Sequence, residues 1–588
     1  MSRHLPLEGM ARRILFACIV PLLVLETIGG FGVVALGQAA SGELHGVARN
    51  LFGQPLALAE VVLRDDGGNL IHIAISGVDG VYAVRRLTPG RYTVSATKEG
   101  FATASPTTIE ITAGQAMQQD LTVGSPSSDH AAEAATALQP PSGKFFRRLF
   151  KAYSDDWKAA PSTEPAPAFR GTPSPVDGPP FPFSDWPYGG SVVISKPWTQ
   201  SGPLMQALWS GQHGEGWKKS GVQIYGWANV GFNISTSDKP GYANLPAAYA
   251  EKPNTIQPDQ EVLYVERQPD TVQTDHFDWG FRVAALYGMD YRFTTAKGVF
   301  SEQLLKHNRE YGFDPVMVYA DLYFPHIAEG MNVRIGRYIS LPDIEAQLAP
   351  NNYTYSHSLT YTYDCYTQSG INTTTRLNDH WLFQAGISAG CEAVPWTRPD
   401  SKPTFNTCLG YSWKDGGDNL YLCANSINDG KYAYNNLAAY YLTWYHKINS
   451  SWHTATESWY QYESQTPNVL NPAASSLLET NANGAFCATG AQLTCFAPEW
   501  AVVNYVEKEF SKHDYLTIRN EYMDDMRGQR TGFKTKYTEH LIGWGHWIGT
   551  TVLLRPELRF ERSYDVPAYD NGTKKNQLML AGDIIYFF

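Results

Sequence analysis

The sequence lacks several features that would place it in a common class of proteins. It has no long run of basic residues, and its net charge of −11 argues against nucleic acid as a partner. No G-x-S-x-G, H-E-x-x-H, P-loop or dinucleotide-binding G-x-G-x-x-G element stands in a supporting context, and no C-x-x-C pair is present. We therefore expect no enzymatic activity, no catalytic residue, no cofactor and no metal site.

Long hydrophobic runs are also scarce. The mean hydropathy is −0.31, and only residues 14–36 are apolar enough to form a membrane helix. Two arginines precede this stretch and small residues follow it, which predicts a secretory signal peptide over residues 1–40. The alternative is a permanent membrane anchor, although a proline, a glutamate and several glycines interrupt the stretch.

Aromatic residues, in contrast, are abundant. They make up 13% of the chain, with 35 Tyr and 16 Trp. These side chains concentrate where one end must be apolar and the other wet, as at membrane interfaces. A high aromatic content with a low mean hydropathy is typical of a transmembrane β-barrel, because only alternate residues of its strands face lipid.

Residues 43–124 contain short alternating runs separated by turn residues, which predict a small β-sandwich. The runs lie at 59–63, 70–74, 81–84, 92–96 and 108–111. The segment resembles the carboxypeptidase regulatory-like (transthyretin-like) domain family in Gly46-Val47, Gly53-Gln54-Pro55-Leu56, Val61-Val62-Leu63, Asp79-Gly80-Val81-Tyr82, Leu87, Pro89-Gly90-Arg91-Tyr92-Thr93-Val94 and Gly100-Phe101. That family is non-catalytic, so the resemblance implies a fold and no active site.

Residues 125–200 are rich in proline and predict an extended linker that cannot bury a core. Thirteen of the 36 prolines lie between positions 126 and 197. Within the linker, residues 145–151 are basic and aromatic. Two interpretations of this segment stay open: it contacts a membrane surface, or it forms a short helical turn on the rim of the barrel.

Residues 220–588 carry long runs in which the two faces of each predicted strand differ. Residues 277–291 alternate between a largely aromatic face and a face with charged residues and glycines. Residues 554–561 alternate four charges with apolar residues, so one face needs water and the other needs lipid or protein. The chain ends at Phe588 after alternating apolar residues. This ending resembles the feature by which outer-membrane barrels are recognised for assembly.

The connections between seventeen candidate strands predict the number of strands in the barrel. Counting back from Phe588, short connections alternate with longer ones, as expected when short turns lie at one rim and long loops at the other. Counts from the two ends agree only if residues 341–369 form one outer loop, which leaves sixteen strands. We therefore predict an all-β chain, with a 16-stranded antiparallel transmembrane β-barrel preceded by the small β-sandwich. Sixteen strands enclose an aqueous lumen.

Six cysteines remain after the predicted signal peptide is removed. An even number in an exported chain favours disulfides. The alternating direction of the strands places Cys365 and Cys391 on the same side of the membrane. Cys408 and Cys423 flank a short turn, and Cys487 and Cys495 share an outer loop. We predict that Cys365 pairs with Cys391, Cys408 with Cys423, and Cys487 with Cys495.

Charged residues on the predicted inner face are the candidate lining of a pore. They are Asp278, Arg282, Asp290, Arg519, Glu521, Arg555, Glu557, Arg559 and Glu561. Both signs occur, which favours weak ion selectivity or a transverse field across a narrow waist. The alternative is that neighbouring opposite charges pair and stabilise the wall. The Tyr-rich loop 341–369 either folds inward and narrows the pore or stays an ordinary outer loop.

A few polar residues suggest other chemistry, which the pattern does not favour. His357, Ser358 and Asp364 could form a catalytic set, but such groupings are common by chance and a triad is recognised by geometry. Asp524-Asp525 and Asp343 with Glu345 could bind a cation, although solvated loop acids are the default. Four histidines are expected at the rim with short turns: His446, His453, His513 and His546.

The barrel half resembles the OmpL-like family of outer-membrane porins (β-barrel porin 2). The resemblance rests on the order and spacing of residues 222–227, 280–291, 334–337, 351–358, 370–379 and the terminal strand. It implies an outer-membrane channel for small solutes, with lipid and the barrel-assembly machinery as partners, the latter through Phe588. A homotrimer is possible in such a family, and the sandwich would lie in the periplasm. The alternative is an envelope adhesin or binding protein anchored by its barrel.

Overall fold

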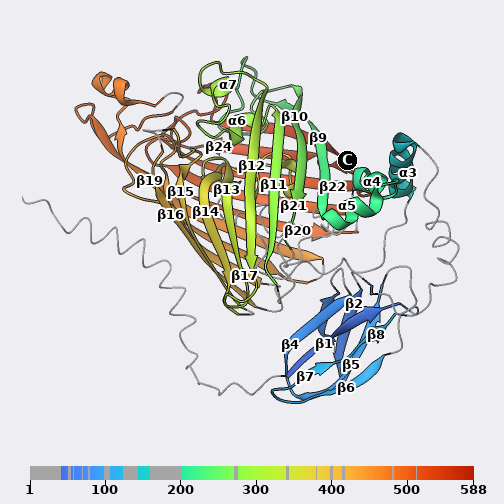
Figure 1. Ribbon diagram of the computed structural model, residues 1–588. Coiled ribbons are helices and arrows are strands. Elements are labelled where there is room, and N and C mark those ends of the chain that lie inside the picture. The colour runs from blue at the N-terminus through green and yellow to red at the C-terminus, as the bar shows by residue number, and fades with distance from the viewer. Residues whose placement is uncertain are drawn as a thin grey trace, which may run out of the picture. The chain divides into compact units, whose positions relative to one another are not determined.

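The computed structural model describes most of the chain (Figure 1). The described residues are 42–123 apart from 51–54, 57–58, 69, 77–79 and 99–105, then 144–158, and 202–588 apart from 270–275, 340–343, 379, 398–400, 414–417, 450, 480–481 and 512. The predicted signal peptide and most of the predicted linker lie outside them. In the described part of the chain, no helix is long and apolar enough to cross a membrane.

The N-terminal compact unit is built from two small sheets. One contains β1 and β4 in antiparallel pairing, with β7 and β8 beside β1, and the other has the order β3-β2-β5-β6. The strands are β1 (Gly42–Arg49), β2 (Glu60–Asp65), β3 (Leu70–Ile75), β4 (Val81–Leu87), β5 (Gly90–Thr97), β6 (Thr107–Ile111), β7 (Ala116–Gln118) and β8 (Leu121–Thr122). This arrangement confirms the predicted sandwich and adds β1, β7 and β8 to the strands expected from the sequence.

Alternation explains the core of the sandwich. In β2 and β5 every second residue is buried, because successive side chains of a strand point to opposite faces. Val61 and Val94 are fully buried between the sheets. Ser76 is also buried, and its hydroxyl donates to Leu56 O at 2.6 Å and accepts from Ala59 N at 2.8 Å. The sandwich therefore has its own apolar core and satisfies this buried polar group within itself.

Among the described residues, three helices precede the barrel: α3 (Phe145–Lys158), α4 (Pro203–Trp209) and α5 (Gly214–Ser220). Helix α3 has fourteen residues, so it is longer than the short helical turn that was one of the two interpretations of this segment. Its aromatic residues recur at helical spacing, and two of them, Tyr153 and Trp157, contact the barrel. Helix α5 is followed by Gly221, which has the left-handed φ of 67° typical of a helix C-terminus and leads directly into the first barrel strand.

The second unit contains a closed antiparallel barrel (Figure 1), in which the last strand, β25, pairs with the first, β9. Its strands are β9 (Val222–Ser235), β10 (Ile256–Arg267), β11 (Asp278–Gly288), β12 (Gly312–Phe324), β13 (Met331–Ile339), β14 (Thr367–Arg376), β15 (Trp381–Cys391), β16 (Thr404–Trp413), β17 (Asp418–Ile427), β18 (Ala438–Lys447), β19 (Trp452–Pro467), β20 (Thr494–Glu509), β21 (Asp514–Asp525), β22 (Thr535–Ile548), β23 (Val552–Leu554), β24 (Glu557–Ser563) and β25 (Asn576–Phe587). Segments β23 and β24 both pair with β22 and β25, so they form one interrupted strand. The barrel therefore has sixteen strands, as predicted.

Short and long connections alternate around the barrel. The connection from β22 to β23 spans 549–551, whereas that from β19 to β20 spans 468–493. Both ends of the barrel lie at the rim with the short connections, because the end of β25 pairs with the first half of β9. The long connections carry α6 (Tyr291–Thr294), α7 (Glu302–Leu305), α8 (Leu359–Thr362), η1 (Ala349–Asn351) and η2 (Pro472–Leu477).

The two faces of the barrel wall differ as the alternation requires. Inward side chains are largely polar and buried, whereas outward apolar side chains are exposed on the isolated chain, including Ile371, Ile387, Phe405, Ile542, Leu558 and Leu580. A continuous outer belt of this kind needs lipid. One predicted strand was too long: β11 ends at Gly288, and Asp290 precedes the short helix α6 instead of continuing the wall.

Candidate functional site

The connection from β13 to β14 folds into the barrel. Residues 344–366, here called the inner loop, are almost entirely buried. Ile344, Leu348, Tyr353 and Leu359 belong to the same apolar cluster as inward residues of the wall. Of the two interpretations left open by the sequence, the structure therefore has the inward fold.

Arg519 of β21 is the main contact between the wall and the inner loop. Its Nη1 donates to Ser356 O at 2.6 Å and to Thr354 Oγ1 at 3.0 Å, and it pairs with Glu345 Oε1 at 3.0 Å. Its Nε pairs with Glu539 Oε1 of β22 at 2.9 Å. One buried guanidinium thus binds loop backbone, loop carboxylate and wall carboxylate together, which its fork of fixed N–H donors permits.

Two wall carboxylates hold backbone N–H groups of the inner loop. Glu557 Oε2 accepts from Tyr355 N at 3.0 Å, and Glu521 Oε2 accepts from Leu359 N at 2.9 Å. A loop buried inside a barrel has no strand partner for its backbone, and an unpaired buried N–H is costly. These contacts therefore explain why charged residues stand on this wall.

Two wall arginines bind the loop carbonyls in the same way. Arg555 Nη1 donates to Ala349 O at 2.7 Å and to Asn352 O at 2.8 Å, while Arg559 Nη1 donates to His357 O at 2.8 Å. Both guanidinium groups are essentially inaccessible to solvent. Five of the nine predicted pore-lining residues therefore hold the inner loop.

Charges of alternating sign continue along this wall. Arg559 pairs with Glu561 at 2.7 Å and with Glu539 at 3.2 Å, so Glu539 lies between Arg519 and Arg559. Glu345 enters the same network from the loop. Burial raises the pKa of Glu345 above its ordinary value, and the nearby Arg519 opposes that rise.

A second set of pairs lies on the wall of β10 to β13. Arg282 Nε pairs with Glu266 Oε2 at 2.6 Å directly across two strands, and Arg267 pairs with Asp278 at 2.9 Å. These contacts agree with the alternative that neighbouring opposite charges pair and stabilise the wall. Asp290, which lies outside the strand, accepts from Gln260 Nε2 at 2.8 Å.

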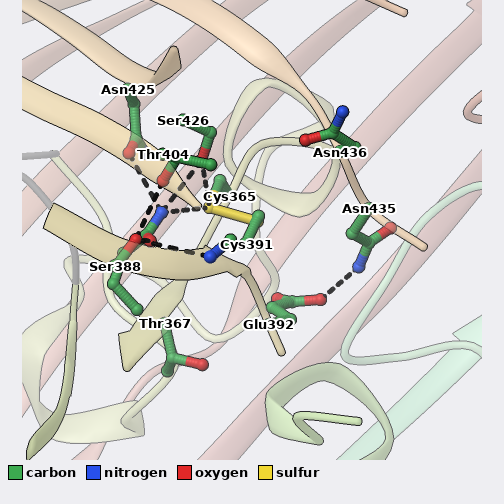
Figure 2. Close-up of a disulfide and its surroundings, with 12 residues drawn as sticks. Cys365, Thr367, Ser388, Cys391, Glu392, Thr404, Asn425, Ser426, Asn435 and Asn436 are labelled. Atoms are coloured by element: carbon green, nitrogen blue, oxygen red, sulfur yellow. Dashed lines mark hydrogen bonds between the residues drawn. A yellow bond between two sulfur atoms is a disulfide. The ribbon is translucent and has the colours of Figure 1, made fainter. Parts of the chain in front are cut away.

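The three disulfides join the pairs predicted from the sequence. Cys408 and Cys423 are cross-strand partners on the inner face of β16 and β17. Cys365 and Cys391 join the end of the inner loop to the end of β15, as Figure 2 shows. Gln368 Nε2 donates to Cys365 Sγ at 3.2 Å and to Ser426 Oγ at 2.9 Å beside this bond. The covalent link therefore pins the inner loop where it rejoins the wall.

The suggested catalytic set has structural partners. Ser358 Oγ donates to Glu345 Oε2 at 3.0 Å and accepts from Tyr361 N at 3.0 Å, which caps α8. The His357 ring interacts with Ala346 O at 2.7 Å and stacks on Tyr249. Ser358 therefore stabilises the loop, and among the described residues neither of these two bonds leads to His357.

The other acids and histidines also have local contacts. Asp525 accepts from Gln529 N and Thr531 N and closes the turn after β21. His446 pairs with Asp418, and His546 pairs with Asp514 at 2.8 Å. His453 Nε2 lies 2.5 Å from Tyr353 OH, and His513 Nδ1 lies 3.2 Å from Trp547 O. Asp343 lies outside the described residues, and no group of three metal-binding side chains occurs among those that are described.

Sequence reasoning missed Glu345, Glu539 and Asp583 as members of the charged network. Glu539 and Asp583 stand on the inner face of strands with clear alternation, so the pattern contained the information needed to find them. Asp583 binds Arg555 at 2.5 Å. Glu345 lies in a loop without periodicity, and nothing in the local sequence indicates its partner.

Comparison with known proteins agrees with both halves of the fold. Residues 221–588 match the family described as "Putative beta-barrel porin-2, OmpL-like", and residues 43–124 match the carboxypeptidase regulatory-like domain. No curated relative matches the chain.

Several solved structures are similar to the barrel. An anion-selective porin from Comamonas acidovorans has 10% identity, with 62% of this chain and 99% of that chain covered and a TM-score of 0.42. The outer membrane channel DcaP of Acinetobacter baumannii has 10% identity, coverage of 62% and 97%, and a TM-score of 0.39. OmpT of Vibrio cholerae, in its trimer form, has 11% identity, coverage of 62% and 99%, and a TM-score of 0.38.

Proposed function

Because the chain belongs to the OmpL-like β-barrel porin-2 family of the outer membrane, we propose that it is a channel through which small solutes diffuse passively. The inner loop sets the width of the passage. The observation that carries this proposal is the set of contacts by which Arg519, Glu521 and Glu557 hold that loop inside a sixteen-stranded barrel. A barrel of this size leaves a lumen unless protein fills it.

The charges of the interior support weak ion selectivity. Both signs occur along β21 to β24, where Glu539 pairs with Arg519 and Arg559, so part of the charge on this wall is compensated. Charged rings set the sign preference of a pore. We expect five of the nine predicted lining residues to act through the position of the inner loop, because they bind it.

Single-channel conductance of the full chain in a planar bilayer tests the proposal. Stable steps are expected, and they should increase in size for Glu557→Gln, which weakens the hold on Tyr355 and Ser356. The matched control is Glu302→Gln on the exposed surface of α7, which should conduct like the native chain. Folded protein that gives no steps in either form would contradict a channel.

A second function, a barrel-anchored adhesin or binding protein, is favoured by one observation. Inward residues of the wall such as Tyr421 and Thr443 are fully buried, as are those under the inner loop. A lumen filled at this level would hold the barrel closed. The absence of conductance steps, combined with unchanged binding of the folded chain to cells or cell-wall polymer, would support this function over the channel.

We also propose that the sandwich lies in the periplasm as an accessory domain. Short connections face the periplasm in such barrels, and both ends of this barrel lie at that rim. Glu110→Cys in β6 should react with a membrane-impermeant maleimide only after the outer membrane is opened. Ser476→Cys in the connection from β19 to β20 is the control and should react in intact cells. Equal labelling of both positions in intact cells would contradict this orientation.

Deletion of residues 43–124 tests the accessory role, because the sandwich has its own core. Conductance steps that persist would make it an accessory, and steps that change would mean that it gates the lumen.

Phe588 remains our candidate for recognition by the assembly machinery. Its backbone pairs with Gly226 at the seam of the barrel, and truncation of Phe588 should lower the amount assembled. A homotrimer remains a prediction, to be tested by crosslinking.

A further inference from the structure

Helix α3 is fastened to the outside of the barrel at the rim with the short connections. Tyr153 donates to Phe587 O at 3.0 Å, and its ring stacks on that of Tyr586 with centroids 5.3 Å apart. The Asp156 carboxylate accepts from Thr550 N at 2.9 Å and from Thr550 Oγ1 at 2.6 Å. Figure 1 shows α3 beside α4 near the C-terminus. Since Tyr586 is an outward residue of β25, the helix lies against the face of the wall that meets lipid.

The apolar stripe of α3 extends past its contact with the barrel. Phe146, Phe150, Tyr153 and Trp157 are spaced by four, three and four residues and therefore share one face of the helix. The C-terminal pair contacts the barrel, with Trp157 Nε1 donating to Thr551 Oγ1 at 2.9 Å. The N-terminal pair is not packed against protein: the Phe146 side chain is 68% exposed and the Phe150 side chain is 70% exposed.

Positive charge gathers beside the exposed phenylalanines. Lys144, Arg147, Arg148 and Lys151 lie in or next to the first two turns, and the first acidic residue is Asp155. Arg148 donates to Ala207 O and helps to fix α4. Aromatic residues beside lysine and arginine are the composition of helices that lie in the interface of a membrane with anionic lipid.

The height of α3 on the barrel matches such an interface. Exposed outward aromatic side chains occur near the short connections at Phe277, Trp381, Trp452, Phe510 and Tyr586. Aromatic girdles mark the boundary between lipid and water on membrane barrels. Because Tyr153 stacks on a member of this girdle, α3 is fastened to the barrel near the boundary that the girdle marks.

We propose that α3 is an interfacial helix, which inserts Phe146 and Phe150 into the phospholipid leaflet at the short-connection rim while its basic residues contact anionic headgroups. It would hold the segment between the sandwich and the barrel on the membrane. This inference rests on the barrel spanning a membrane and does not depend on whether the lumen conducts.

A fluorophore placed on each face of α3 tests the insertion. The full chain with Phe150→Cys carries an environment-sensitive dye and is reconstituted into vesicles of phosphatidylcholine with phosphatidylglycerol and spin-labelled lipid. Asp155→Cys, on the opposite face of the helix, is the matched control. We expect several-fold stronger quenching and a blue-shifted emission at position 150. Equal quenching at both positions would overturn the proposal.

Two further measurements separate lipid from other occupants of the same face. Arg147→Gln with Lys151→Gln should remove the difference in quenching between vesicles with and without phosphatidylglycerol, while heat stability of the barrel stays unchanged. Loss of barrel stability instead would overturn the assignment of these residues to headgroups. Energy transfer between labelled copies at position 150, with no quenching by lipid, would show that a second copy covers the helix and would also overturn the proposal.

Discussion

Arg519 and Glu345 form an ion pair in the interior of the barrel, with 3.0 Å between Nη1 and Oε1 and at most 4% of either side chain exposed. They lie 174 positions apart in the chain. Arg519 comes from a strand and Glu345 from the inner loop, so the pair forms only when the loop is docked inside the barrel. The same carboxylate accepts from the Tyr505 hydroxyl and from Ser358 N. The stability of the docked loop therefore depends on a few buried charged contacts.

Glu345→Gln should loosen the inner loop without unfolding the barrel, because Arg519 keeps its contact with Glu539. A hydrogen bond to a charged group contributes about 1.5–3 kcal/mol, so local opening should become roughly tenfold or more easier. Hydrogen exchange of peptides from residues 344–366, followed by mass spectrometry, measures this. Glu302→Gln is the exposed control. Unchanged exchange of the loop would show that Arg519 does not hold it through Glu345.

Removing the Cys365–Cys391 disulfide should also release the loop, from its other end. The double variant Cys365→Ser/Cys391→Ser is expected to raise hydrogen exchange in residues 344–366 and to make channel openings noisier. Cys408→Ser/Cys423→Ser is the matched control, because those cysteines join strands that are already paired in the wall. If both double variants behave alike, the first disulfide has no special effect on the loop.

Glu251, in the connection from β9 to β10, should make that connection sensitive to pH. Burial raises the pKa of Glu251 from 4.5 to about 7, although the nearby Arg292 and Lys252 oppose the rise and Glu310 adds to it. Between these values the folded state binds the proton more tightly than the unfolded state. The contribution of Glu251 to stability is therefore fully present below pH 4.5 and is lost as the pH rises to about 7, by about 1.4 kcal/mol for each pKa unit.

Equilibrium unfolding in urea over this range measures the effect. Glu251→Gln keeps the shape of the protonated acid, so its stability should change less between pH 4.5 and pH 7 than that of the native chain. Glu215→Gln, on the exposed surface of α5, is the control and should leave the pH profile as it is. A native profile that rises with pH over this window, with the Glu251→Gln profile parallel to it, would refute the assignment.

The wall pair of Asp321 and Arg334 should show a large coupling energy. Nε and Nη2 of Arg334 each lie 2.9 Å from a different oxygen of Asp321, and both side chains are buried. Asp321→Asn leaves a buried guanidinium without its carboxylate, which should lower the free energy of unfolding by about 3–5 kcal/mol. Adding Arg334→Gln should recover part of this loss. Strictly additive effects in a double-mutant cycle would mean that the pair does not act as a unit.

Much of the barrel could be predicted because each strand carries its own evidence. The alternation in residues 554–561 identifies an inner and an outer face without knowledge of any partner, and parity of the connections yields sixteen strands. The disulfide pairs followed from the same parity. Errors occurred where the period changes, as at Asp290, where β11 gives way to a helical turn. Helix α3 was only half recognised, because its proline-rich flanks suggested an extended linker.

The chain's local patterns establish the strands, the faces of the wall and the class of fold, because a two-residue period is a property of neighbouring residues. Whether residues 344–366 turn inward is decided by contacts with Glu457, Arg519 and Arg555, which more distant strands bring to the right height. The same is true of α3, whose apolar stripe meets the barrel at Tyr586 and Phe587. A side chain's partner across the molecule has no local pattern, so only the closed barrel determines which charges hold the loop and which surface remains for lipid.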